Sequence, residues 1–188
     1  YMQPLIEKFA TYLADERNLS PHTRAAYLRD LSEFRGFLER HGGSGQEALI
    51  RLDNLLLRRY LAELHKRNQR SSIARKLSTL RTFFRYLVRE GQLPTYPAEG
   101  LSTPKLNRYL PKTLSVDEAT ALMERGYGSS VLDLRDRAIV ELFYSSGLRV
   151  SELTGLDVGA LDLREKLVRV LGKGRKERIL PIGRKAHE

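Results

Sequence analysis

The chain has 188 residues, and 33 Lys and Arg against 23 Asp and Glu give it a formal charge of +10 at pH 7 and a pI near 10.0. A hydrophobic fraction of 41% excludes bulk disorder, and the apolar runs are too short for a transmembrane helix, which needs about 20 residues. The absence of Cys excludes disulfides and Cys-ligated zinc, and it fits a reducing cytoplasm. The excess of positive charge predicts a polyanionic partner, most simply nucleic acid.

Residues 1–93 show the apolar periodicity of four amphipathic helices, which predicts the core of a small bundle. The first helix is expected over residues 4–16. The second begins with Ser20 as N-cap and Pro21 in the first helical position, and it ends before two glycines at 42–43. Asp53 caps the third helix, and the fourth begins near Ser71. The apolar stripe of the fourth helix consists of Ile73, Leu77, Leu80, Phe84 and Leu87.

The opposite face of the fourth helix carries the main candidate contacts with DNA. Residues 66–89 contain eight Lys and Arg and no acid. A helix face that contacts only solvent usually mixes Glu with Lys, whereas this face combines Arg with Ser and Thr, which bind phosphates and base edges. The predicted contacts on this helix are Ser71, Arg75, Thr79 and Thr82, flanked by Arg81 and Arg85. The second helix shows a weaker version of this pattern with His22, Ala25, Arg29 and Ser32.

Four of the seven prolines lie between residues 94 and 111, and because Pro interrupts helices an interdomain linker is predicted at 94–112. A helical DNA-binding domain is therefore expected over 1–93 and a second domain over 113–188. In the second domain Ser115 and Glu118 form a capping box that opens a helix, and a longer helix over 132–146 should bury Ala138, Leu142 and Tyr144.

The last part of the chain is expected to form a small antiparallel sheet. A short helix is predicted over 149–153, followed by strands at 161–163, 167–171 and 177–182 with a turn at 172–176. The predicted fold class is therefore mainly α with a small antiparallel β-sheet.

The candidate catalytic residues are Arg149, Glu152 and Lys173. No nucleotide-binding glycine motif is present and the four His lack metal-ligand spacing, so no metal and no cofactor are expected. Arg149 can direct two N–H groups at phosphate oxygens, Glu152 lies one turn later, and Lys173 in the predicted turn can give a proton to a leaving oxygen. These groups suit phosphoryl transfer at DNA. From the spacing alone, a surface ion pair and a solvated Lys remain an open alternative.

Three segments carry a family pattern: residues 136–153, which include YSSGLRVSEL, residues 172–178 with the sequence GKGRKER, and residues 19–31 near the N-terminus. They resemble the tyrosine site-specific recombinases of the integrase family, and most of all the bacterial Xer recombinases. The resemblance implies a four-helix, SAM-like core-binding domain followed by the first part of an α+β catalytic domain. It implies that Arg149 is the first catalytic arginine, Glu152 its supporting acid and Lys173 the general acid.

The resemblance also implies a His-x-x-Arg motif, a second His or Trp and a nucleophilic tyrosine after Lys173, yet all nine tyrosines precede Lys173. We therefore expect a chain cut midway through its catalytic domain, which binds double-stranded DNA without cleaving it. For the whole protein, the family implies a 3′-phosphotyrosyl intermediate, a cytoplasmic tetramer on two DNA sites, a possible second recombinase as partner and a role in chromosome-dimer resolution. The alternatives are a DNA-binding regulator or decoy fragment without chemistry, and a helical protein-interaction domain.

Overall fold

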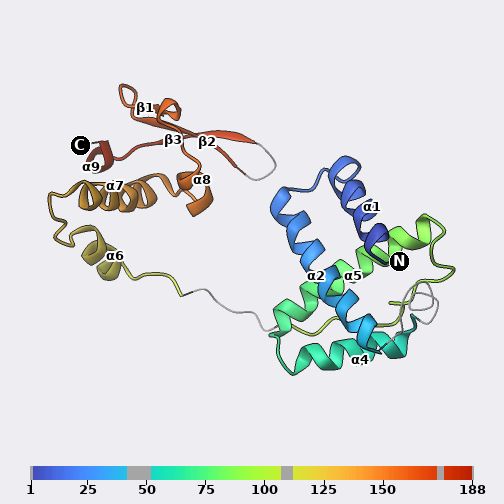
Figure 1. Cartoon of the computed structure of the whole chain (residues 1–188). Helices are drawn as coiled ribbons and strands as arrows, with labels where there is room; N and C mark the ends of the chain where they lie inside the picture. Colours follow the sequence, from blue (N-terminus) through green and yellow to red (C-terminus); the bar gives the residue numbers. More distant parts are fainter. Residues whose placement is uncertain (1, 42–51, 107–111, 173–175, 188) are drawn as a thin grey trace. The chain divides into compact units, whose positions relative to one another are not determined.

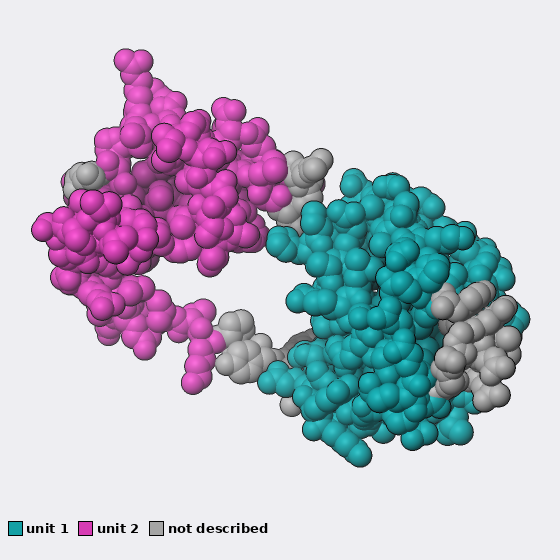
Figure 2. All heavy atoms as spheres, in the orientation of Figure 1, with its two compact units in different colours: residues 1–109 teal, residues 110–188 magenta. Residues whose placement is uncertain are grey.

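The structure is a computed structural model that describes residues 2–41, 52–106, 112–172 and 176–187. The chain divides into two compact units, residues 1–109 and 110–188, which are coloured separately in Figure 2 and are described here one at a time. Within the described residues, no helix is long and apolar enough to cross a membrane. The first unit contains α1 (Met2–Asp15), α2 (Pro21–His41), α4 (Asn54–His65) and α5 (Arg70–Arg89) (Figure 1).

Helix α5 is central to the first unit because it packs against both α2 and α4, while α1 packs against α2. The predicted stripe of α5 is buried, with Ile73 and Phe84 fully inaccessible to solvent. Aromatic rings join the helices: Phe34 of α2 meets Tyr60 of α4 and Phe84 of α5 with ring centroids 5.0 and 5.9 Å apart. The predicted four-helix bundle is therefore confirmed.

The local signals that start the helices act as expected. The side chain of Asp53 accepts a hydrogen bond from the backbone N–H of Leu56 at 2.7 Å and so caps α4. The backbone N–H of Thr23 donates to the hydroxyl of Ser20 at 3.2 Å, and Pro21 opens α2. Each cap satisfies a backbone donor that the first helical turn leaves without a partner.

The residues that α5 buries cover more of the helix circumference than the apolar stripe in the sequence predicted. Thr79 was expected on the exposed face, yet it is fully buried, and Tyr86 is 8% exposed. The physical reason is that α5 has helices on two sides, so residues beyond its apolar stripe also lie at helix interfaces. The structure thus corrects the assignment of Thr79 as a DNA contact.

The first half of the predicted linker packs on the first unit. Ala98 and Leu101 are 3% and 7% exposed and belong to the same apolar core as the four helices. The side-chain amide of Asn54 donates to the carbonyl of Glu99 at 2.7 Å, which ties this segment to the start of α4. Residues 107–111 lie outside the described part, and the domain bounds 1–93, 94–112 and 113–188 stay a prediction.

The second unit begins with two capped helices, α6 (Val116–Met123) and α7 (Val131–Ser146). The capping box of Ser115 and Glu118 is present, and Ser130 forms a similar box with Asp133 at α7. Helix α7 ends at Gly147, whose φ of 60° places it in the left-handed region that favours glycine. The remaining elements are α8 (Val150–Thr154), η1 (Val158–Ala160), β1 (Leu161–Asp162), β2 (Leu167–Leu171), β3 (Glu177–Pro181) and α9 (Arg184–His187).

The three strands form the predicted antiparallel sheet in the order β1-β2-β3, and Val170 of β2 pairs with Arg178 of β3. Val168 and Val170 point to the buried face of β2, while Arg169 between them is exposed. Together with Leu148 and Ile182 these valines form a core of four buried apolar residues.

Part of α7 differs from its predicted orientation. Ala138 is exposed and Tyr144 is 71% exposed, although both were expected in the core, whereas Leu142 packs on the small apolar core as predicted. The residues of α7 that are buried are Glu141 and Ser146. The reason for the difference is that α6, α9 and β3, which contact α7, bury neither Ala138 nor Tyr144.

Candidate functional site

The basic face of the first unit lies on α5, where five polar residues follow one another at intervals of three and four. Ser71, Arg75, Ser78 and Arg85 are exposed, and Thr82 is half-buried. The hydroxyl of Thr82 donates to the carbonyl of Ser78 at 3.0 Å, so its polar atom lies next to the helix backbone. This row of side chains, which we call the α5 stripe, keeps most of the predicted DNA contacts on one side of the helix.

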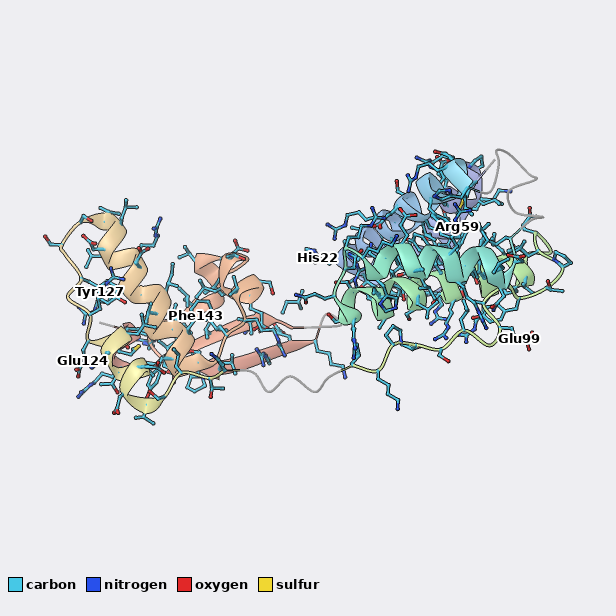
Figure 3. The ribbon with its side chains drawn as sticks, turned by 90° about the horizontal axis from the view of Figure 1, so that it is seen from below. His22, Arg59, Glu99, Glu124, Tyr127 and Phe143 are labelled. Atoms are coloured by element: carbon cyan, nitrogen blue, oxygen red, sulfur yellow. The ribbon has the colours of Figure 1, made fainter. Side chains whose placement is uncertain are left out.

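A second exposed row lies on α2 and consists of His22, Ala25, Arg29 and Ser32. Figure 3 shows His22 at the outer edge of the first unit, where α2 begins. Ala25 is small enough to let the helix backbone approach a nucleic-acid groove. The two rows are neighbours because Asp30 of α2, next to Arg29, contacts Arg75 of the α5 stripe.

Asp30 joins the two helices through a buried ionic network. Its side chain is 3% exposed and accepts hydrogen bonds from Arg75 and, at 3.0 Å, from the hydroxyl of Thr79. Lys76 lies 3.4 Å from Asp30 and also binds Glu33. Since the side chain of Arg75 is 49% exposed, one side of its guanidinium is held by Asp30 while the other faces solvent. Thr79 therefore orients the interior partner of Arg75 and does not contact a ligand itself.

Arg81 and Arg85, the two arginines predicted to flank the exposed face of α5, have different surroundings. Arg81 is turned toward the end of the first unit, where it donates to the carbonyl of Leu101 and, at 2.7 Å, to the hydroxyl of Thr103. Arg85 is exposed and its guanidinium carbon lies 5.8 Å from the centre of the Tyr96 ring. The structure thus gives Arg81 a packing role and keeps Arg85 in the α5 stripe.

The second unit brings Arg149 and Glu152 together, as their spacing predicted. Arg149 stands at the start of α8, and its guanidinium donates to Glu152 Oε1 at 2.8 Å. The backbone N–H of Arg149 donates to Glu152 Oε2 at 2.8 Å, so the carboxylate is held at both oxygens. The Glu152 side chain is 3% exposed and that of Arg149 is 62% exposed. A buried acid therefore orients an arginine that remains accessible to a ligand.

Arg178 of β3 is a third member of this cluster, and the sequence reasoning did not select it. Its guanidinium donates to Glu152 Oε2 at 2.7 Å. With two arginines around one carboxylate, the cluster carries a net positive charge, which suits a phosphate. The signal that could have identified Arg178 is its position inside the basic segment that includes Lys173, but no periodicity indicates which of those cations turns inward.

Hydrogen bonding keeps Glu152 ionised. Its pKa lies below the ordinary value, first because the backbone N–H of Arg149 donates to the carboxylate and further because both guanidinium groups do, while burial acts in the opposite direction. The carboxylate therefore stays negative at neutral pH and continues to hold both arginines.

Lys173 lies outside the described residues, but its neighbour Gly172 lies close to the cluster. The backbone N–H of Gly172 donates to the carbonyl of Lys176 at 2.8 Å, which closes the end of the β2–β3 hairpin. A Cβ added to Gly172 would lie 3.6 Å from Glu152 Oε1. Among the described residues, no group of three or more His, Cys, Asp or Glu could hold a metal ion.

Comparison with known families assigns both units. The phage integrase N-terminal SAM-like domain matches residues 6–91, and the phage integrase family matches residues 112–188. The chain belongs to the phage integrase family of tyrosine recombinases. This integrase-family chain is 50% identical over 188 residues to the tyrosine recombinase XerC of Pelobacter propionicus and 45% identical over 192 residues to that of Syntrophus aciditrophicus. These matches cover 98% and 100% of the chain but 62% of each relative, so the chain spans about three fifths of their length.

Solved structures agree on the fold of this integrase-family chain. A lambda integrase dimer bound to a COC′ core site matches with a TM-score of 0.70 at 19% identity, covering 95% of this chain and 48% of that one. The XerH recombinase bound to palindromic difH matches with a TM-score of 0.67 at 17% identity, covering 93% and 52%. At these identities the likeness concerns the fold, a core-binding bundle followed by a mixed helical and sheet unit.

Proposed function

We propose that the whole protein is a site-specific recombinase that cuts and rejoins double-stranded DNA through a 3′-phosphotyrosyl intermediate. The observation that carries this proposal is the accessible arginine Arg149, oriented by the buried carboxylate of Glu152 beside the hairpin that contains Lys173. The proposal is supported by the two family matches and by relatives named tyrosine recombinase XerC.

Each proposed catalytic group acts at a stated atom of the scissile phosphate. A tyrosine beyond Lys173 in the whole protein gives its hydroxyl proton to a base in the same part of the protein and attacks the phosphorus. Its oxygen forms the 3′-phosphotyrosyl bond while the bond to the 5′-oxygen breaks. Arg149 offsets the charge that grows on the non-bridging oxygens, and Lys173 gives its proton to the leaving 5′-oxygen. The 5′-hydroxyl of a second strand then attacks the phosphotyrosine. Because one phosphodiester replaces another, the reaction needs no nucleotide hydrolysis.

The proposed partners and role follow from the family. We assign the protein to a tetramer on two DNA sites in the cytoplasm, with a second recombinase as a further proposed partner, and to the resolution of chromosome dimers. In this arrangement the α5 stripe and the row on α2 bind the duplex, through Ser71, Arg75, Thr82 and Arg85 on α5 and His22 and Arg29 on α2.

Binding to duplex DNA tests the role of the first unit. The affinity of the 188-residue chain should fall with salt, with a log–log slope of about −0.9 for each phosphate contacted. Arg75→Ala should weaken binding and reduce this slope by about 1, because one phosphate contact is lost. Arg17→Ala is the control, since Arg17 is exposed, lies just beyond the end of α1 and belongs to neither row. An affinity that does not change with salt would contradict the proposal.

Strand cleavage tests the role of the second unit. The 188-residue chain should form no covalent adduct with DNA, whereas a chimera that joins it to the remaining part of the Pelobacter propionicus relative should cleave a recombination site of that relative. In this chimera Arg149→Ala should slow cleavage about 100-fold or more while DNA binding is kept, because the arginine acts on charge that develops in the transition state.

The role of Lys173 has its own test in the chimera. Lys173→Ala should slow cleavage of ordinary DNA but much less that of a substrate with a 5′-thiolate leaving group, which needs no proton. If the thiolate substrate does not rescue the variant, Lys173 positions the phosphate and is not the acid. A phosphotyrosine adduct formed by the 188-residue chain alone would show that the nucleophile is one of its nine tyrosines.

A further inference from the structure

Arg178 connects two elements that carry the proposed catalytic residues. It lies on β3 opposite Val170 of β2, at the end of the hairpin that contains Lys173. Its guanidinium donates to Glu152 Oε2 at 2.7 Å, and Glu152 lies on α8, which begins directly after Arg149. One ion pair thus joins the β2–β3 hairpin to the helix of Arg149.

The contact between the β2–β3 hairpin and α8 depends on one acceptor, the carboxylate of Glu152. Glu152 is the acceptor that the guanidinium of Arg178 reaches among the described residues, and the Nε of Arg178 is buried there without a hydrogen-bond partner. The side chain of Arg178 is 38% exposed, whereas that of Glu152 is 3% exposed. The carboxylate is therefore fixed from two directions, by Arg149 at Oε1 and by Arg178 at Oε2.

We propose that Arg178 is a positioning residue that holds the β2–β3 hairpin against α8, so that the two elements next to the proposed catalytic residues keep one relative position. The inference rests on the proposed function and adds to it a residue that touches neither the phosphate nor the leaving oxygen. Its action passes through Glu152. Without Arg178, the carboxylate keeps its contacts with Arg149 but loses its ion pair with β3, and the position of the β2–β3 hairpin against α8 is no longer fixed by this pair.

The same hairpin provides a matched control. Arg169 of β2 pairs with Glu177 at 3.4 Å, and both side chains are mostly exposed, at 63% and 56%. Arg169→Met and Arg178→Met remove the same charge from neighbouring strands, but only the second variant affects Glu152. Surface ion pairs such as that of Arg169 contribute little to stability.

The first experiment uses the 188-residue chain and requires no cleavage. Carboxyl carbon NMR should show that the pKa of Glu152 rises in Arg178→Met and stays at its original value in Arg169→Met. Amide exchange at Gly172, whose N–H closes the hairpin, should become faster in Arg178→Met. Arg178→Lys should bring the pKa of Glu152 and the amide exchange rate of Gly172 part of the way back to their original values. A Lys can offer one charged donor to Glu152 but not the planar geometry of a guanidinium.

The second experiment measures single-turnover cleavage by the chimera with the Pelobacter propionicus relative. Arg178→Met should slow cleavage at least about tenfold at an unchanged DNA affinity, since a displacement of 1 Å caused by a residue outside the chemistry can cost about 100-fold. Arg178→Lys should recover part of the rate, and Arg169→Met should cleave at the original rate.

The outcomes separate this inference from the proposed function. If Arg178→Met cleaves as fast as Arg169→Met, the positioning role is wrong even when the NMR spectra change. If DNA affinity falls together with the rate, Arg178 contacts DNA directly and the inference is also wrong. If the unsubstituted chimera does not cleave, the proposed function fails, and the NMR comparison decides by itself whether Arg178 holds the hairpin against α8.

Discussion

Asp30 shows how one buried residue can support a surface that binds a ligand. It contacts three side chains of α5, Arg75, Lys76 and Thr79, from its position on α2. Burial of a carboxylate is costly unless charged or polar donors surround it, and two cations and one hydroxyl supply them here. The exposed side of Arg75 is therefore oriented from inside the bundle.

Asp30→Asn should destabilise the first unit by about 3 kcal/mol, near the lower end of the range for breaking a buried ion pair, because Lys76 keeps Glu33 as a partner. Urea unfolding would measure the change. Asp15→Asn is the control, since Asp15 is exposed at the end of α1 and its substitution should change stability by no more than about 0.5 kcal/mol. Equal stability of the two variants would contradict the role assigned to Asp30.

Gly183 is required where β3 leads into α9, because the backbone passes close to α7. A Cβ at this position would lie 2.6 Å from the Cβ of Ser145, and the neighbouring Ser146 donates to the carbonyl of Pro181 at 2.7 Å. Gly183→Ala should therefore destabilise the second unit by about 1–3 kcal/mol through overpacking. Thermal unfolding would measure this against Gly159→Ala, where an added Cβ would meet nothing within 4 Å. Equal melting temperatures would show that α7 can move away at little cost.

At the scale of the elements, short capped helices depend on the charge of their caps. In α6 the side chain of Glu118 accepts the backbone N–H of Ser115 at 2.8 Å. The pKa of Glu118 lies below its ordinary value, first because of this backbone hydrogen bond and then because of the hydrogen bond with the Ser115 side chain. The bond therefore favours the folded helix when Glu118 is ionised.

The pH dependence of α6 follows from this direction. A carboxylate whose pKa is lower in the folded state stabilises fully above its unfolded value, about 4.3, and loses its contribution as pH falls through the folded value. The protection factors of the amides in α6 should fall between about pH 5 and pH 3, and Glu118→Gln should remove this dependence because an amide does not titrate. Glu124→Gln at the end of the same helix should leave it unchanged. If the protection factors of α6 still depend on pH in Glu118→Gln, another group causes the dependence.

At the scale of the whole molecule, the two units differ in how much apolar surface they bury. The first unit has a large core with six fully buried aromatic side chains: Tyr60, Phe9, Phe34, Phe37, Phe83 and Phe84. Among its described residues, the second unit has four buried apolar side chains and leaves Val131, Tyr144 and Val158 largely exposed. Since burial of apolar surface is the main favourable contribution to folding, the first unit should fold without the second.

Fragments of the first unit test where it ends. A fragment of residues 1–106 should unfold cooperatively, whereas a fragment ending at the predicted domain boundary, 1–93, should be less stable by about 2 kcal/mol. The reason is that the shorter fragment loses Leu101, and burial of one Leu side chain contributes roughly 1.5–3 kcal/mol. Urea unfolding of both fragments provides the comparison. Equal stabilities would support the boundary at residue 93.

Most elements of the fold were predictable because their signals are local. The cap at Asp53, the capping box of Ser115 and Glu118, and the glycine at 147 act within one helical turn, and the alternation around Val168 and Val170 is a property of one strand. The proximity of Arg149 and Glu152 was also predictable, since residues three apart on a helix are neighbours.

The sequence by itself determined the helices α1, α2 and α4 to α8, the strands, the basic face of α5 and the pair of Arg149 with Glu152, because each of these features has a signal in residues close together along the chain. It did not predict η1 and α9. Only the tertiary structure decided that Thr79 is buried, that Leu101 belongs to the first unit and that Arg178 joins Glu152. Thr79 meets Asp30 49 residues away, and Arg178 meets Glu152 26 residues away. Such contacts depend on which faces of distant elements pack together, and periodicity within one element does not contain that information.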